Sequence, residues 1–228
     1  MTEMDPHANQ PIAHAGAPLE AAKAVMIMIH GRGASPRDIL PLGALLNKPS
    51  IAYLAPAAAG GAWYPRPFIA PREQNEPWLS SALGVIDSLV VDLIARGFSS
   101  QKILLLGFSQ GACLATEYSI RYPRRYGGVL ALSGGLIGAP GTTWDDVTTA
   151  ALKDMPVFLG CSDVDSHIPK ERVIESESVF KRLGARVTRK LYPGMGHAVN
   201  DDEIQNVRSI ADEVVNRNAI QSSPVAPN

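Results

Sequence analysis

The chain has 228 residues, 46% of them hydrophobic, which is enough for one substantial core. Its 21 basic and 22 acidic residues nearly cancel, so neither a nucleic acid nor an anionic membrane surface is expected as a partner. No apolar stretch approaches the ~20 residues of a membrane span, and no secretory signal is recognised. With only two cysteines, we expect reduced thiols and a cytoplasmic protein.

Apolar runs of strand length alternate with helical patterns along the first half of the chain. Residues 1–22 are expected to form a flexible lead-in, with a short edge strand near His14. Ser35 precedes a proline and is typical of a helix N-cap. The loop over residues 56–76 is long enough to suggest a function. The predicted elements are strands at 24–29 and 51–54 and helices at 36–46 and 77–96.

The same alternation continues through the second half of the chain. Strands that alternate with helices predict a mostly parallel sheet with helices on both faces. We expect a single domain over residues 23–218 and a disordered tail over 219–228. Ligands bind such sheets at the carboxyl ends of the strands. The predicted elements are strands at 103–106, 128–133, 156–160 and 185–191 and helices at 110–122, 170–183 and 201–216.

The strand at 103–106 runs straight into the sequence Gly-Phe-Ser-Gln-Gly, which contains Ser109. A serine between two glycines at a strand-to-helix turn is typical of a nucleophile. Such a turn lifts the hydroxyl above the sheet and aims the next N–H group at an oxyanion. The alternative is a glycine-rich turn whose serine only caps the helix. A free serine is a weak nucleophile, so the first interpretation requires a base and an acid.

Candidates for the base and the acid follow two later strands. His197 lies in a glycine-flanked turn, and Asp163 and Asp165 come just after the strand at 156–160. Ser, Asp and His therefore occur in the order that α/β-hydrolases use. His167 is too close to Asp165 in sequence to face it across a site, so we interpret it as structural or pocket-lining.

Two further segments could contribute to the site. His30 precedes Gly-Arg-Gly, a turn that could present a second oxyanion N–H group or only satisfy its own geometry. Residues 62–68 carry three aromatic rings and two prolines, so they could wall a pocket or pack under their own loop. No spacing typical of a metal or phosphate site occurs, and we expect no metal and no cofactor.

Together these motifs resemble those of a known family. From about residue 22 to residue 216 the chain resembles the phospholipase/carboxylesterase family of small α/β-hydrolases, which includes the acyl-protein thioesterases. The sequence Gly-Phe-Ser-Gln-Gly is considerably more specific for this family than the general pattern Gly-x-Ser-x-Gly. The matching landmarks are His30-Gly31-Arg32-Gly33, Trp63-Tyr64-Pro65, Gly107-Phe108-Ser109-Gln110-Gly111, Asp163-Val164-Asp165 with Ile168-Pro169, and Gly194-Met195-Gly196-His197.

The resemblance implies roles for individual residues. Ser109 would be the nucleophile, His197 the base, and the N–H groups of Arg32 and Gln110 the oxyanion hole. Counting back from the Ile-Pro pair selects Asp165 as the acid. The residue after that aspartate is a serine here and a proline in the family, which leaves Asp163 as the alternative. Arg32 stands where the thioesterases tend to carry an apolar residue, which weakens any expectation of long acyl chains.

The expected protein is therefore a serine carboxylesterase that hydrolyses small acyl or aromatic esters through an acyl-enzyme. Trp63, Tyr64 and His30 are expected to bind the substrate, and the excursion at 134–154 is too short to make more than a minimal lid. Alternatives are an acyl-thioesterase or lysophospholipase and, in another class, a non-catalytic ligand-binding module. The expected partner is a small-molecule ester, without stable membrane association, and the expected assembly is a monomer or homodimer.

Overall fold

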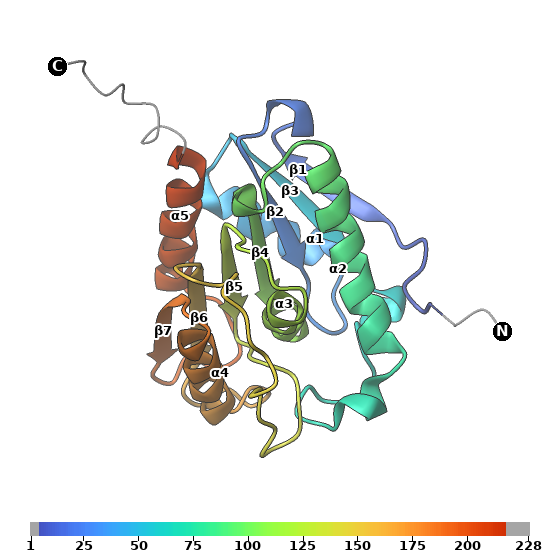
Figure 1. Ribbon diagram of the computed structural model, residues 1–228, viewed down its shortest axis with the longest axis vertical. Coiled ribbons are helices and arrows are strands. Elements are labelled where there is room, and N and C mark those ends of the chain that lie inside the picture. Colours follow the sequence, from blue (N-terminus) through green and yellow to red (C-terminus); the bar gives the residue numbers. More distant parts are fainter. Residues whose placement is uncertain (1–4, 218–228) are drawn as a thin grey trace.

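The structure is a computed structural model and describes residues 5–217. One seven-stranded sheet has the order β1-β3-β2-β4-β5-β6-β7. Only the β1–β3 pair is antiparallel; the other neighbouring pairs are parallel (Figure 1). The strands are β1 (Ile12–Gly16), β2 (Ala24–Ile29), β3 (Ile51–Pro56), β4 (Ile103–Phe108), β5 (Gly128–Leu132), β6 (Pro156–Ser162) and β7 (Arg186–Tyr192).

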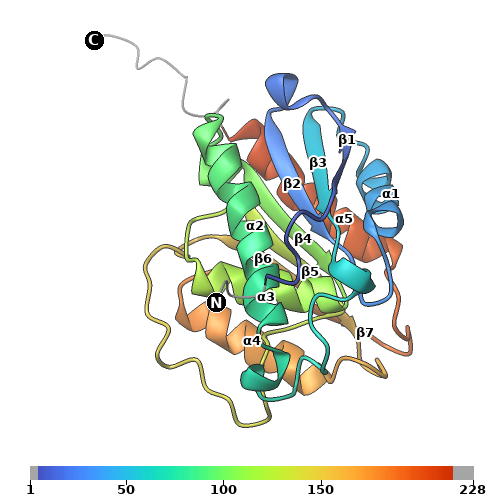
Figure 2. The same cartoon turned by 90° about the vertical axis from the view of Figure 1, so that its right-hand side faces the viewer.

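Five helices cover both faces of the sheet in the described part of the chain. They are α1 (Pro36–Leu46), α2 (Trp78–Ala95), α3 (Gln110–Arg121), α4 (Lys170–Arg182) and α5 (Asp201–Asn216). Figure 2 shows α2, α3 and α4 on one face and α1 and α5 on the other. Each face has its own hydrophobic cluster, since alternate residues of β2, such as Ile27 and Met28, belong to opposite clusters.

The predicted α/β architecture is confirmed, and the predicted helices and strands begin and end within two residues of the observed ones. Local capping explains this accuracy at two helices. The Ser35 N–H donates to the Asp38 carboxylate at 2.8 Å at the start of α1. The Asn200 side chain accepts from the Glu203 N–H at 2.9 Å at the start of α5. Residues 133–155 contain no helix or strand.

The expected flexible lead-in over residues 1–22 is wrong from residue 5 onward. The predicted edge strand forms as β1, which pairs with β3. Ahead of it, the His7 side chain is 1% exposed. Its Nδ1 accepts from the Ala59 N–H at 3.0 Å, and its Nε2 lies 2.9 Å from the Trp63 carbonyl oxygen. A single buried histidine leaves no periodic signal in a sequence, which explains the error. The expected tail over 219–228 lies outside the described residues.

Helix α2 is the one helix of residues 5–217 that is long and apolar enough to cross a membrane, with a mean hydropathy of 1.6. No such segment is predicted from the length of the apolar runs in the sequence. The helix carries a buried stripe that includes Leu79, Leu83, Ile86 and Val90. This stripe packs into the core on the α2–α3–α4 face. Packing in the protein core therefore accounts for much of its apolar character.

Candidate active site

Ser109 lies at the turn between β4 and α3, at the carboxyl end of the central strand. Its φ of 55° and ψ of −120° belong to a region that residues with side chains rarely adopt. Two glycines make the turn possible. A Cβ on Gly107 would lie 2.2 Å from the Gly111 carbonyl oxygen, and a Cβ on Gly111 would lie 2.0 Å from the Ile29 carbonyl oxygen. The turn thus has the sharp geometry that the sequence predicts.

His197 and Asp165 approach Ser109 from the ends of β7 and β6. The Ser109 Oγ lies 2.9 Å from His197 Nε2, and His197 Nδ1 lies 2.7 Å from an Asp165 carboxylate oxygen. The other carboxylate oxygen accepts from the N–H groups of His167 and Ile168 at 2.8 and 3.0 Å. Burial opposes ionisation of Asp165, but the hydrogen bonds from His197 and these N–H groups outweigh it and lower its pKa. Asp165 is therefore an ionised acceptor that orients His197.

Asp163, the alternative acid, has a different place in the structure. Its Oδ1 accepts from the Gly194 N–H at 2.8 Å, in the turn that carries His197. The neighbouring Ser162 Oγ accepts from the Gly196 N–H at 3.1 Å. The side chains of Asp163 and Ser162 therefore hold the backbone of the turn that carries His197. Of the two aspartates, Asp165 alone contacts the imidazole. The sequence could not distinguish them because both follow the same strand.

The Gly31–Arg32 turn lies directly beside Ser109. A Cβ on Gly31 would be 3.3 Å from the Ser109 Cβ. Among residues 5–217, the backbone N–H groups of Arg32 and Gln110 have no hydrogen-bond acceptor, so both can donate to a substrate oxygen. Free N–H groups next to the serine are what an oxyanion hole requires.

His30 supports this turn and does not reach the substrate space, so its expected role in substrate binding is wrong. The side chain is 1% exposed and does not line the pocket. Its Nε2 accepts from the Ala58 N–H at 3.1 Å, so Nδ1 carries the proton and donates to the Gly31 carbonyl at 2.8 Å. Burial lowers the pKa of His30, which keeps the ring neutral in this arrangement.

Trp63 is likewise a support and does not line the pocket, contrary to expectation. The side chain is fully buried, and its Nε1–H donates to the His30 carbonyl at 2.9 Å. The Gln110 side chain fastens the same loop, accepting from the Trp63 N–H and donating to the Tyr64 carbonyl. Tyr64 does line the pocket, so its predicted role in substrate binding stays a prediction. Sequence patterns show that a loop is aromatic but not which way each ring faces.

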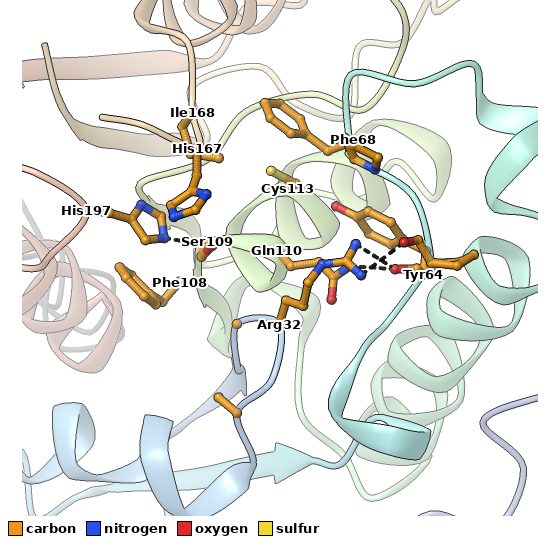
Figure 3. A pocket seen from close by; sticks show the side chains of 14 residues that line it. Arg32, Tyr64, Phe68, Phe108, Ser109, Gln110, Cys113, His167, Ile168 and His197 are labelled. Carbon is orange, nitrogen blue, oxygen red and sulfur yellow. Dashed lines mark hydrogen bonds between the residues drawn. The ribbon is translucent and has the colours of Figure 1, made fainter. Parts of the chain in front are cut away.

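A pocket of about 510 Å³ opens over Ser109 and His197 (Figure 3). Cys113, four residues after Ser109 on α3, also lines it; the sequence analysis missed this residue, although helical spacing from Ser109 would have found it. Across residues 5–217 no group of three His, Cys, Asp or Glu side chains is placed to hold a metal ion. The remaining lining side chains are Arg32, Ala34, Tyr64, Pro65, Pro67, Phe68, Phe108, Gln110, His167 and Ile168.

A serine on a tight turn after the central parallel strand, with histidine and aspartate supplied by later strand ends, defines an α/β-hydrolase. A family model described as phospholipase/carboxylesterase matches residues 11–214. The crystal structure of a phospholipase/carboxylesterase from Dyadobacter fermentans is 36% identical and superposes with a TM-score of 0.84, covering 94% of this chain and 100% of that one. The chain belongs to the phospholipase/carboxylesterase family, as the sequence predicts.

Curated relatives agree with this assignment. Acyl-protein thioesterase 1 of Kluyveromyces lactis is 33% identical over 57% of this chain and 57% of its own length. Acyl-protein thioesterase 1 of Cryptococcus neoformans is 25% identical over 84% of this chain and 92% of its own length. For the Kluyveromyces lactis protein and two other fungal acyl-protein thioesterases, the match spans little more than half of the relative's length.

Proposed function

We propose that the protein is a serine carboxylesterase that hydrolyses small acyl or aromatic esters. One observation carries the proposal: the hydrogen-bonded series Ser109–His197–Asp165 opens into the pocket. In the first step His197 Nε2 takes the proton of Ser109 as its Oγ attacks the ester carbonyl carbon. The resulting oxyanion accepts hydrogen bonds from the N–H groups of Arg32 and Gln110.

His197 then donates its proton to the departing alcohol oxygen, and an acyl-enzyme remains on Ser109. Water enters from the open pocket, loses a proton to His197, and attacks the acyl carbonyl. Collapse of the second oxyanion releases the acid and returns the proton to Ser109. Asp165, ionised and with a fully buried side chain, stabilises the imidazolium that forms in both halves of the reaction.

A thioester or a lysophospholipid is the competing substrate class. The curated relatives named acyl-protein thioesterase support this alternative. Arg32 on the pocket wall favours small or polar acyl groups, because an alkyl chain packed against it would desolvate a charge. A cytoplasmic location is part of the proposal, since Cys113 and Cys161 are both free and buried. As its assembly we propose a monomer or homodimer.

A fluorophosphonate probe, which reacts with activated serines, tests the proposed function. We expect labelling of the native protein and none of Ser109→Ala, with kcat for a neutral short-chain ester lowered by roughly 10⁴- to 10⁶-fold. Ser80→Ala, which changes an exposed serine of α2, is the matched control and should label normally. A purified Ser109→Ala protein that kept a tenth of the activity would contradict the proposed nucleophile. A wild-type protein that neither labels nor hydrolyses any ester would indicate the non-catalytic binding module.

A further inference from the structure

The side chains that line the pocket carry an unbalanced charge. Arg32, His167 and His197 are basic, and no lining residue is a carboxylate. The nearest acid of the site, Asp165, has a fully buried side chain and is hydrogen-bonded to His197. The one permanent charge among the lining side chains is therefore that of Arg32, and no lining carboxylate balances it, even though the chain as a whole is close to neutral.

Arg32 is held in one place by the loop over residues 62–68. Its guanidinium donates to the carbonyl oxygens of Tyr64, Pro65 and Arg66 at 2.8, 3.1 and 2.9 Å. All three acceptors are uncharged, so they fix the guanidinium without neutralising it. Nε and the second N–H of the Nη1 amino group are not used in these bonds, and the side chain is exposed to the pocket. A fixed cation with free donors is well suited to a carboxylate.

The position of Arg32 places its charge next to the acyl part of a bound substrate. The leaving alcohol must lie next to His197, because that imidazole donates a proton to it. Figure 3 shows His167 and His197 on one side of Ser109 and Arg32 with Tyr64 on the other. The acyl chain, directed away from His197, therefore extends along Arg32. The same residue would bind the oxyanion through its backbone N–H and a second group through its side chain.

We propose that the preferred substrates are esters whose acyl group carries a carboxylate, such as the monoesters of short dicarboxylic acids, and that the Arg32 guanidinium binds this carboxylate. The proposal rests on the proposed esterase function and names its substrate class.

The test compares each anionic ester with a neutral partner of the same shape. Monoethyl succinate, glutarate and adipate are paired with the esters in which the free carboxylate is a primary amide, and kcat/KM is measured by pH-stat. For wild type at low ionic strength we expect the best monoester to exceed its amide by roughly tenfold, equivalent to about 1.4 kcal/mol. The ratio should decrease with added salt, because the guanidinium is exposed.

Arg32→Gln should bring this ratio close to one. Because the ratio is formed within each variant, any general loss of activity from a disturbed Arg32 N–H group cancels. The matched control is Arg37→Gln, which removes an exposed charge of α1 outside the pocket and should leave the ratio unchanged. A wild-type ratio of one or below, or an Arg32→Gln ratio equal to that of wild type, would overturn the proposal. So would a preference found only for carboxylates on the alcohol side.

Binding to Ser109→Ala separates this proposal from the esterase function. Calorimetric titration with monoethyl glutarate and its amide measures recognition without turnover. We expect roughly tenfold tighter binding of the anion, lost in the Ser109→Ala, Arg32→Gln double variant. If neutral esters are hydrolysed through Ser109 but the anion is not favoured in rate or binding, the esterase function stands and this proposal fails. If no ester is hydrolysed, the esterase function and this substrate class both fail, and the binding comparison then shows only whether Arg32 binds a carboxylate.

Discussion

At the scale of single residues, the two aspartates after β6 give a sharp prediction. Asp165→Asn should lower kcat/KM for a neutral ester by roughly 10²-fold or more, because an amide cannot stabilise the imidazolium. Asp163→Asn should cost less than about fivefold, because its amide oxygen can still accept from the Gly194 N–H. Steady-state kinetics of both purified variants, with thermal melts to verify folding, make the comparison. The reverse ranking would transfer the acid role to Asp163.

At the residue scale, the sequence points to side chains that the structure brings together where chemistry and position coincide. Ser109 directly follows β4 between Gly107 and Gly111, and His197 lies in the glycine-containing turn that follows β7. Prediction from sequence failed for His30 and Trp63, whose side chains point into the supporting layer beneath the pocket. A polar or aromatic residue near a site can bind the substrate or hold the backbone that does. Only the path of the loop in three dimensions decides between the two.

At the scale of elements, the start of α5 contains a buried acid with a pH-dependent effect. Glu203 has no exposed surface, one carboxylate oxygen accepts from the Asn200 N–H, and the other has no partner within residues 5–217. Burial raises its pKa to about 7. A carboxyl whose pKa is higher in the folded than in the unfolded state contributes stability that is complete below about pH 4.5. This stability is lost as the pH rises through about 7.

Glu203→Gln removes this titration but keeps the oxygen that caps the helix. The free energy of unfolding of the variant, relative to wild type, should therefore increase between pH 5 and pH 8, on the order of 1–3 kcal/mol. Urea unfolding at the two pH values measures it. Glu171→Gln, at an exposed position of α4, is the control and should show no such change. A pH-independent difference for Glu203→Gln would contradict the expected titration.

The segment before β1 also contributes to stability at this scale. His7 connects it to the loop that leads to Tyr64. His7→Ala should lower the free energy of unfolding by roughly 1–3 kcal/mol, since it leaves the Ala59 N–H and Trp63 carbonyl unpaired. Urea denaturation measures the loss, and faster hydrogen exchange at Ala59 would localise it. His14→Ala, at an exposed position on β1, is the control. Unchanged stability and exchange would mean that the segment is not held by His7.

The elements themselves were largely predictable, for a physical reason. Buried parallel strands are continuous apolar runs, and helix starts depend on neighbouring residues such as Ser35 and Asn200. Both signals are local in sequence. The packing of residues 5–10 depends on contacts with a loop some fifty residues away, and no local pattern encodes such a contact.

At the scale of the whole molecule, the open pocket predicts the range of substrates. None of the residues 134–154 lines the pocket, so the excursion does not cover it. Each added CH₂ of a neutral acyl chain should help by up to ~0.8 kcal/mol only until the wall formed by Tyr64 and Phe68 is reached. We therefore expect kcat/KM to be highest at acyl lengths of about two to six carbons. A chain-length series of 4-nitrophenyl esters and matched thioesters measures this preference.

Activity should also be the same below and above the micellar concentration of the substrate, since within residues 5–217 no segment forms a lid over the pocket. A steady rise to C12 or C16, or a sharp increase above that concentration, would favour a lipase or a depalmitoylating thioesterase instead.

The pairing of β1 has a consequence for aggregation. Residues 12–16 occupy the outer edge of β3, whose own six residues are all buried. A chain shortened to begin after residue 16 would present the unpaired N–H and C=O groups of an apolar strand to solvent. Such an edge can pair with the same edge of a second molecule. The short antiparallel strand therefore protects the protein against intermolecular sheet formation, independently of any part it has in catalysis.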